Sequence, residues 1–333
     1  MSTSTGAGAR TVPPYEEILT LACRAPSIHN TQPWFWRIHR DEEGLDLLAD
    51  HSRRLMHADP DERNLIISCG AALHHLQVVA AGLGWEASVR RLPDRSEPGL
   101  LATVVLEPSK LASAAARRLH SVTVRQTDRR RFTRVRVSDE LLRRLARQGS
   151  EWGAQVLPAP PESVNELLRL NAHADEKQRA DEGYLAEITA WTQYRRGEGV
   201  RREALPRQHP ETALSDAGGR FPDGGLDEAV PSRDQARSSA LLLVSSSSDD
   251  TLSRLRAGEA MSDVWLRATE KDLSVVPLSQ CIEVPETRER IIARMLDDRT
   301  FPQILLHVGR LPPTRQPLPR SLRRPIGDVI VRG

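Results

Sequence analysis

One short polar stretch, APSIHNTQPWFW from Ala25 to Trp36, carries side chains well suited to bind a ligand. Its prolines restrict the backbone, while a hydroxyl, two amides and free peptide N–H groups offer donors and acceptors without net charge. The polar side chains are those of Ser27, Asn30 and Gln32. Such a surface suits a planar heterocycle rimmed by carbonyls and ring nitrogens. The alternative is a turn in which the two amides only cap neighbouring backbone.

A basic run, RQTDRRRFTRVR, holds six arginines between Arg125 and Arg136. A guanidinium group donates two parallel hydrogen bonds, so it suits a phosphate dianion. Arg125, Thr127 and Arg129 together would form a phosphate-binding grip. The alternative is a solvated, arginine-rich connector. Aromatic residues do not alternate with these arginines as they do in single-strand nucleic-acid platforms, since Phe132 stands alone.

Other kinds of reactive site find little support in the sequence. The histidines show no HExxH, HxH or carboxylate-histidine spacing, and we expect His74 and His75 to face different directions on a helix, so no metal site is predicted. No GxSxG, Walker A or GxGxxG pattern occurs. The three cysteines form no CxxC pair, and we interpret each as a small buried hydrophobic residue.

The composition favours a globular protein of the cytoplasm. The chain has 333 residues and a formal net charge of +2, so no strong overall field attracts nucleic acid or an anionic membrane. No apolar run approaches the roughly 20 residues that span a bilayer. The first dozen residues lack a hydrophobic segment and are interpreted as a frayed tail.

Hydrophobic periodicity predicts a mixture of helices and strands. Helices are expected over Tyr15–Ala25, Asn64–Gly82, a segment capped by Ser138, and about Asp249–Lys271; strands over Trp34–His39, Leu45–Ala49, Trp85–Arg90, Leu100–Glu107, Ala240–Ser245 and after Pro302. Asp59, Asp61 and Glu62 are interpreted as acids at a helix start, where they favour the positive end of the helix dipole.

The two long helical segments resemble each other. CGAALHHLQVVAAGLGW from Cys69 and AGEAMSDVWLRATEKDL from Ala257 share apolar steps about 188 residues apart. An internal duplication is one explanation, and a chance likeness of two amphipathic helices is the other. Between Asn171 and Arg237 charges, glycines and prolines dominate, so we expect a partly helical excursion over the surface.

The motif APSxxNxQPW resembles the flavin-contacting loop of the FMN-dependent nitroreductase superfamily. RxTxR resembles the family's basic phosphate-binding segment, RRPIGDVIV its C-terminal element, and SVVPLSQ the loop whose backbone meets the flavin edge. The resemblance implies FMN contacts from Pro26, Ser27, Ile28, His29, Asn30, Gln32, Arg125, Gln126, Thr127, Arg129, Pro277, Leu278, Ser279, Arg323 and Arg324, with Arg323 preferred over Arg324 for the phosphate.

The resemblance also implies an architecture. Ordinary family members are homodimers that carry both motifs in each subunit, whereas here the loop motif lies in the first half and the arginine motif in the second. The chain therefore resembles the Acg-like branch, a fused pseudo-dimer of α+β nitroreductase fold with mixed and antiparallel sheets and one flavin site. The expected parts are a tail at 1–12, a first half at 13–115, and a second half at 116–333 with a lid-like insertion at about 171–237.

For function, the resemblance implies an FMN-dependent NAD(P)H reductase of nitro-aromatics or quinones, in which no side chain acts as a catalytic acid. The first alternative is a protein that stores or sequesters FMN beneath a closed lid. The second is an arginine-rich nucleic-acid binder. We expect no metal, nucleic-acid or membrane partner, and either a monomeric pseudo-dimer or a further homodimer.

Overall fold

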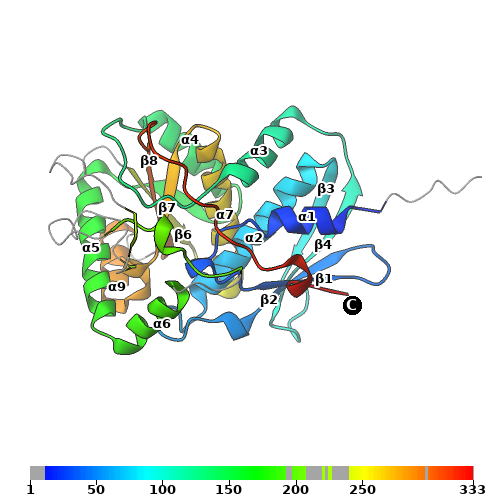
Figure 1. The fold of residues 1–333 in the computed structure, drawn as a ribbon, viewed down its shortest axis with the longest axis horizontal. Coiled ribbons are helices and arrows are strands. Elements are labelled where there is room, and N and C mark those ends of the chain that lie inside the picture. Colours follow the sequence, from blue (N-terminus) through cyan, green and yellow to red (C-terminus); the bar gives the residue numbers. More distant parts are fainter. Residues whose placement is uncertain are drawn as a thin grey trace, which may run out of the picture.

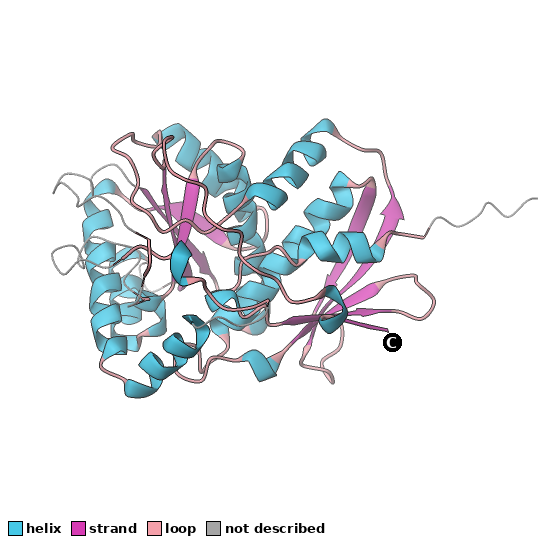
Figure 2. Ribbon diagram, in the orientation of Figure 1, coloured by secondary structure: helices cyan, strands magenta, loops and turns pink. Residues whose placement is uncertain are grey.

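The computed structural model describes residues 12–192, 197–207, 220–221, 224–226, 240–296 and 299–332. Two β-sheets lie in separate halves of the molecule, and two long helices meet between them (Figures 1 and 2). Each sheet is covered by helices. The predicted α+β class is confirmed.

The first sheet takes strands from both ends of the chain, in the order β3-β4-β2-β1-β9. They are β1 (Trp34–Ile38), β2 (Leu45–Ala49), β3 (Trp85–Arg91), β4 (Leu100–Pro108) and β9 (Ile330–Arg332). The predicted hairpin of β1 and β2 is antiparallel, while β9 lies parallel to β1. The chain's last strand thus joins the sheet of the first half, although the expected boundary assigned it to the second.

The second sheet repeats the plan of the first. Its strands are β5 (Gln155–Pro158), β6 (Ala240–Ser246), β7 (Ser274–Leu278) and β8 (Phe301–Gly309). Read from one edge, the order is β7-β8-β6-β5, which matches β3-β4-β2-β1 strand for strand. The internal duplication is therefore visible in the topology. The segment expected as a loop near Ser274 is the edge strand β7, because its backbone pairs with β8.

The central helices α2 (Arg63–Gly82) and α7 (Thr251–Thr269) cross at two glycines. A Cβ atom on Gly70 would lie 2.0 Å from the carbonyl oxygen of Leu255, and one on Gly258 would lie 2.0 Å from that of Ile67. Gly70 and Gly258 are 188 residues apart in the chain, and so are Ile67 and Leu255. These reciprocal contacts relate the two halves by a pseudo-two-fold arrangement.

Replacing Gly258 by Ala is expected to destabilise the protein by about 2 kcal/mol, because the helices must move apart to admit the methyl group. Gly327→Ala is the control, since nothing lies within 4 Å of a Cβ atom at that position. Thermal unfolding measures both variants. Equal melting temperatures for Gly258→Ala and Gly327→Ala would contradict the tight crossing.

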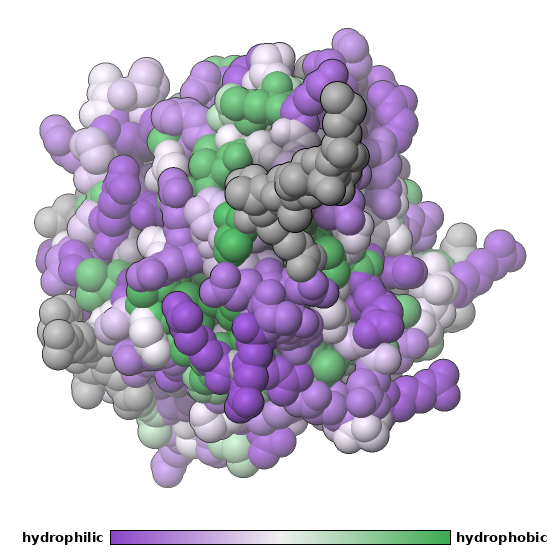
Figure 3. Space-filling view, turned by 90° about the vertical axis from the view of Figure 1, so that its right-hand side faces the viewer, coloured by the Kyte–Doolittle hydropathy of each residue, from purple (hydrophilic) through white to green (hydrophobic). Residues whose placement is uncertain are grey.

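Helix α2 begins where acidic residues were expected to start it. The Asp59 carboxylate accepts the backbone N–H groups of Asn64 at 3.0 Å and Leu65 at 2.8 Å. This helix is long and apolar enough to cross a membrane, but 89% of its most apolar window is buried inside the protein. Its hydrophobicity is that of a core helix. On the face shown in Figure 3, polar and charged residues surround smaller apolar areas.

The remaining helices surround this core. They are α1 (Tyr15–Ala22), α3 (Ser113–Val124), α4 (Asp139–Ser150), α5 (Pro161–Arg179), α6 (Glu182–Thr192), α8 (Gln280–Glu283) and α9 (Pro285–Met295). The predicted cap of α4 is confirmed, since Ser138 Oγ accepts the N–H of Leu141. The predicted excursion begins inside α5 and includes α6, while most of its later part lies outside the described residues.

The prediction that His74 and His75 face different directions is wrong. His74 Nδ1 lies 2.7 Å from Ser262 Oγ, and His75 Nδ1 lies 2.9 Å from the same hydroxyl. The glycine crossing brings α7 so close to α2 that one hydroxyl reaches both imidazoles. The result is a buried polar cluster between the halves.

Candidate functional site

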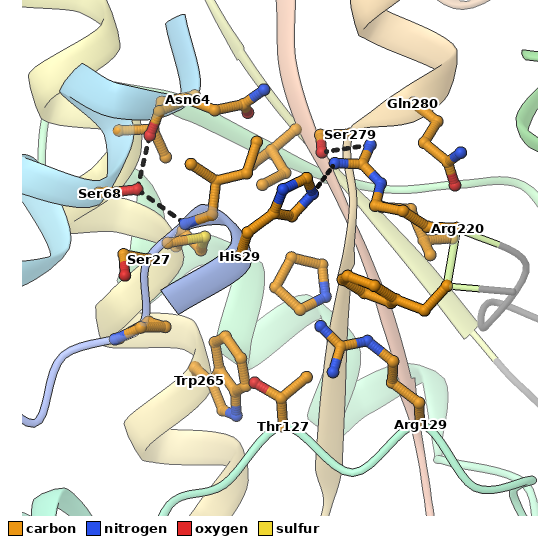
Figure 4. Close-up of a pocket in the computed structure, with 18 residues that line it drawn as sticks. Ser27, His29, Asn64, Ser68, Thr127, Arg129, Arg220, Trp265, Ser279 and Gln280 are labelled. Carbon is orange, nitrogen blue, oxygen red and sulfur yellow. Dashed lines mark hydrogen bonds between the residues drawn. The ribbon is translucent and has the colours of Figure 1, made fainter. Parts of the chain in front are cut away.

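A cavity lies between the halves, beside the crossing of α2 and α7 (Figure 4). The first half contributes Pro26, Ser27, Ile28, His29, Asn64, Ile67 and Ser68; the second contributes Thr127, Arg129, Met261, Trp265, Pro277, Leu278, Ser279, Gln280 and Ile304. Arg220 and Phe221 complete the lining. The loop and the arginine segment identified in the sequence thus meet at one cavity.

The loop after α1 is held in shape by its own polar groups. Ser27 Oγ accepts the N–H of Gln32 at 3.0 Å, and Ser68 Oγ on α2 accepts the N–H of Ile28 at 3.1 Å. His29, Asn30 and Gln32 adopt positive φ angles of 46°, 56° and 50°. This tight backbone presents Pro26 to His29 to the cavity, as expected for this part of the motif.

Asn30 and Gln32 were expected to address the ligand directly, but their side chains bind protein backbone. Asn30 Nδ2 donates to the carbonyls of Gly199 and Leu322, both at 3.1 Å. Gln32 Nε2 donates to Gly197 O at 2.8 Å, and Gln32 Oε1 accepts the N–H of Arg324 at 2.9 Å. The alternative of a backbone-capping turn therefore describes these two amides. They hold the C-terminal segment against the loop.

The positioned segment brings Arg323 to the end of α1. Arg323 Nε donates to Cys23 O at 2.8 Å, and its Nη2 donates to Arg24 O at 2.8 Å. Its Nη1 donates to Asn30 Oδ1 at 3.1 Å. Arg125 Nη2 donates to the same Arg24 carbonyl at 3.1 Å, so the two guanidinium groups are neighbours.

Arg125, which is buried, and Arg323, which is half-buried, form a cluster of positive charge. The Arg125 guanidinium lies 4.6 Å from the centre of the Trp265 ring, which lines the cavity. Burial, reinforced by the charges of Arg323 and Arg24, lowers the pKa of Arg125 to about 9. Within the described part of the chain, Arg125 Nε and Nη1 have no hydrogen-bond partner and no carboxylate pairs with either arginine. Buried N–H donors that lack an acceptor are suited to bind an anion.

The other predicted phosphate ligands do not join this cluster. Arg129 lies 5.0 Å from the Phe221 ring, in the cavity lining, where burial lowers its pKa to about 10. Arg324 pairs with Asp50 at 3.5 Å, so its charge is compensated. Gln126 Nε2 donates to the carbonyl oxygen of Pro319 at 3.4 Å. Of the two C-terminal arginines, Arg323 is thus the one beside Arg125.

Arg220, which was not among the predicted site residues, holds one wall of the cavity together. Its guanidinium lies 3.3 Å from Ser279 Oγ and 3.0 Å from His29 Nε2 (Figure 4). It also lies 2.7 Å from Glu283 Oε2. Glu283 also accepts from Asn64 Nδ2 at 2.9 Å. Arg220 lies in a stretch of weak periodicity, so no sequence pattern marked it.

Residues of α2 and α7 in the lining were missed for a different reason. Asn64, Ser68, Met261 and Trp265 lie on the central helices, and no sequence motif assigned them to a site. The helices are indeed the core, but a cavity opens beside their crossing. A polar residue in the first turn of an otherwise apolar helix, such as Asn64, was the feature of the sequence that could have indicated the cavity.

Two fused copies of one α+β unit, with a cavity and an arginine cluster where they meet, define a protein with a candidate ligand site at its internal interface. The chain belongs to the NAD(P)H nitroreductase family. It is 36% identical over 317 residues to the Mycobacterium tuberculosis protein named "Putative NAD(P)H nitroreductase Rv3131", covering 94% of this chain and 90% of the relative.

Two further relatives come from the same organism. The protein named "Putative NAD(P)H nitroreductase acg" is 30% identical over 311 residues, which cover 93% of this chain and 92% of the relative. The "Uncharacterized protein Rv3127" is 31% identical over 320 residues, covering 93% and 90%. No protein-family model matches the chain. The resemblance stated from the sequence motifs is confirmed.

Proposed function

We propose that the cavity binds one FMN and that the protein is an NAD(P)H-dependent reductase of small aromatic acceptors, such as nitro-aromatics or quinones. The observation that carries this proposal is the neighbouring pair of Arg125, which is buried, and Arg323, which is half-buried; among the described residues neither guanidinium group has a carboxylate partner. A dianionic phosphate supplies the missing charge and accepts the unpaired N–H groups of Arg125.

The lining fits the remainder of FMN. Trp265 links the arginine cluster, where the phosphate binds in this proposal, to the cavity, because it lies against Arg125 and also lines the cavity. Thr127 lies next along the arginine segment and faces the ribityl chain in this proposal. The isoalloxazine lies between the loop from Pro26 to His29 and the end of β7 at Pro277 to Ser279. Arg129 belongs to this ring end rather than to the phosphate.

Bound FMN supplies the hydride chemistry that amino-acid side chains lack. The chain's own residues orient the ring and exclude water. Pro277 and Leu278 form a wall of the cavity, and Phe221 contacts the His29 ring in a T-shaped arrangement with centroids 5.4 Å apart. No side chain is assigned as a general acid.

The three free, buried cysteines agree with the reducing cytoplasm, which we propose as the location.

A second candidate is a protein that holds FMN without turning it over. The observation in its favour is that Arg220 and Phe221 lie in the cavity lining, tied to Glu283, Ser279 and His29. In this proposal they are part of a lid within the expected 171–237 insertion. A closed lid excludes both nicotinamide and acceptor.

The absorbance spectrum of the purified protein tests the shared part of both candidates, and a flavin spectrum is expected. Anaerobic mixing with NADPH then separates them. Bleaching of the flavin absorbance within minutes is the result expected for the reductase, whereas a spectrum that stays oxidised supports storage. A colourless protein that takes up no added FMN would overturn both.

A further inference from the structure

The hydrogen bond from Arg220 decides which nitrogen of His29 carries the proton. Arg220 Nη1 lies 3.0 Å from His29 Nε2, and a guanidinium group can only donate, so Nε2 accepts. Burial and the charges of Arg220 and Arg129 lower the pKa of His29 well below its usual range, so the imidazole is neutral. A neutral imidazole that accepts at Nε2 carries its hydrogen on Nδ1.

This Nδ1–H group is buried and unpaired. His29 is 4% exposed, and Nδ1 has no hydrogen-bond partner in the part of the chain that the structure describes. A buried donor without an acceptor costs free energy, so structures rarely retain one unless a ligand or water completes it. Because His29 lines the cavity, a ligand bound there can supply the missing acceptor (Figure 4).

We propose that His29 donates a hydrogen bond from Nδ1 to an oxygen of the aromatic ligand held in the cavity. The fitting chemistry is a carbonyl or nitro oxygen, which belongs either to the flavin ring or to a quinone or nitro-aromatic acceptor. Arg220 is a positioning residue that fixes the tautomer, and Glu283 and Ser279 hold Arg220 in place. This inference rests on the proposed function.

The variants His29→Asn and His29→Asp test the donor with matched shapes. Both residues tolerate the positive φ of 46° at this position. The Asn amide nitrogen lies close to where Nδ1 lies in His, whereas the Asp carboxylate has nearly the same shape as the Asn amide but offers no donor. Thermal unfolding of both variants checks that each is folded.

Two measurements distinguish the two sources of the oxygen. If the acceptor belongs to the flavin, fluorescence titration of the apo-protein shows His29→Asp binding FMN and riboflavin about tenfold more weakly, with a lower flavin midpoint potential. If it belongs to the substrate, flavin affinity stays within about twofold, and KM for 1,4-benzoquinone rises about tenfold. In either case His29→Asn recovers most of the loss.

Equal behaviour of the Asn and Asp variants in every measurement, with wild type binding FMN, would overturn the role of His29 and leave the proposed function standing. A wild-type protein that binds no flavin would overturn both.

The tautomer can be measured directly: in protein labelled with ¹⁵N-histidine, the His29 signals should report an Nδ1–H tautomer. Arg220→Ala should turn them into a mixture, and an Nε2–H tautomer in wild type would refute the assignment.

Discussion

Arg125→Ala is expected to weaken FMN binding about 10- to 100-fold while leaving riboflavin binding within about twofold. Removing the guanidinium deletes charge-assisted hydrogen bonds worth roughly 1.5–3 kcal/mol to the phosphate, which riboflavin lacks. Arg323→Ala should behave in the same way, because both arginines donate to the Arg24 carbonyl and would contact the same phosphate in the proposed complex. Fluorescence titration of the apo-protein with each flavin provides the comparison.

Arg117→Ala is the matched control, since Arg117 is an exposed arginine on α3 whose charge is screened by water and salt. It should bind both flavins as the wild type does.

A further comparison tests the position of Arg129 relative to the flavin. Because Arg129 lies beside Phe221 at the ring end, Arg129→Ala should weaken FMN and riboflavin binding to similar extents. Equal losses of the two flavins in Arg125→Ala would contradict the assignment of the phosphate.

Asp249→Asn is expected to destabilise the fold by about 3 kcal/mol, because it leaves several arginines without their counter-charge. Asp249 pairs with Arg63 of α2, with Arg288 of α9 at 2.6 Å and with Arg254 of α7 at 3.4 Å. The carboxylate therefore connects the first half of the molecule to the second. Chemical denaturation at neutral pH measures the loss, and Asp94→Asn at an exposed turn is the control.

The same carboxylate predicts how stability depends on pH. Despite partial burial, hydrogen bonds and charge from Arg63 hold the pKa of Asp249 well below its usual range. A carboxyl group with a depressed folded-state pKa stabilises the fold above its unfolded value of about 3.9, and this contribution is lost as the pH falls below that value. The difference between wild type and Asp249→Asn should therefore shrink as the solution is acidified from pH 5. A constant difference down to pH 2 would refute this account.

Local sequence determined the elements that carry the site. The hairpin of β1 and β2, the helix capped by Ser138 and the strand at β8 were predictable, because alternation, helical periodicity and caps act over a few residues. Motif spacing also identified the loop from Pro26 and the arginine segment from Arg125. The likeness at an offset of 188 residues anticipated the duplication, which the matching strand orders of the two sheets made plain.

The roles of individual side chains were decided by the tertiary structure. Asn30 and Gln32 have amides that suit a ligand, yet these amides form hydrogen bonds with the backbone of residues 197–199 and 322–324. Arg125 and Arg129 differ by four positions, but one lies beside Arg323 and the other beside Phe221. A short motif specifies which hydrogen-bonding groups are present, but it does not specify which distant segment of the chain will bond to them.

The sequence by itself located a neutral polar loop near the start of the chain and an arginine-rich segment further along, and it left open whether the chain is an internal duplication. Only the tertiary structure decided that Arg220 joins His29, and that β9 returns to the first sheet. Such contacts join residues nearly 200 or 300 positions apart. They depend on how the two halves pack at Gly70 and Gly258, and no local periodicity encodes that packing.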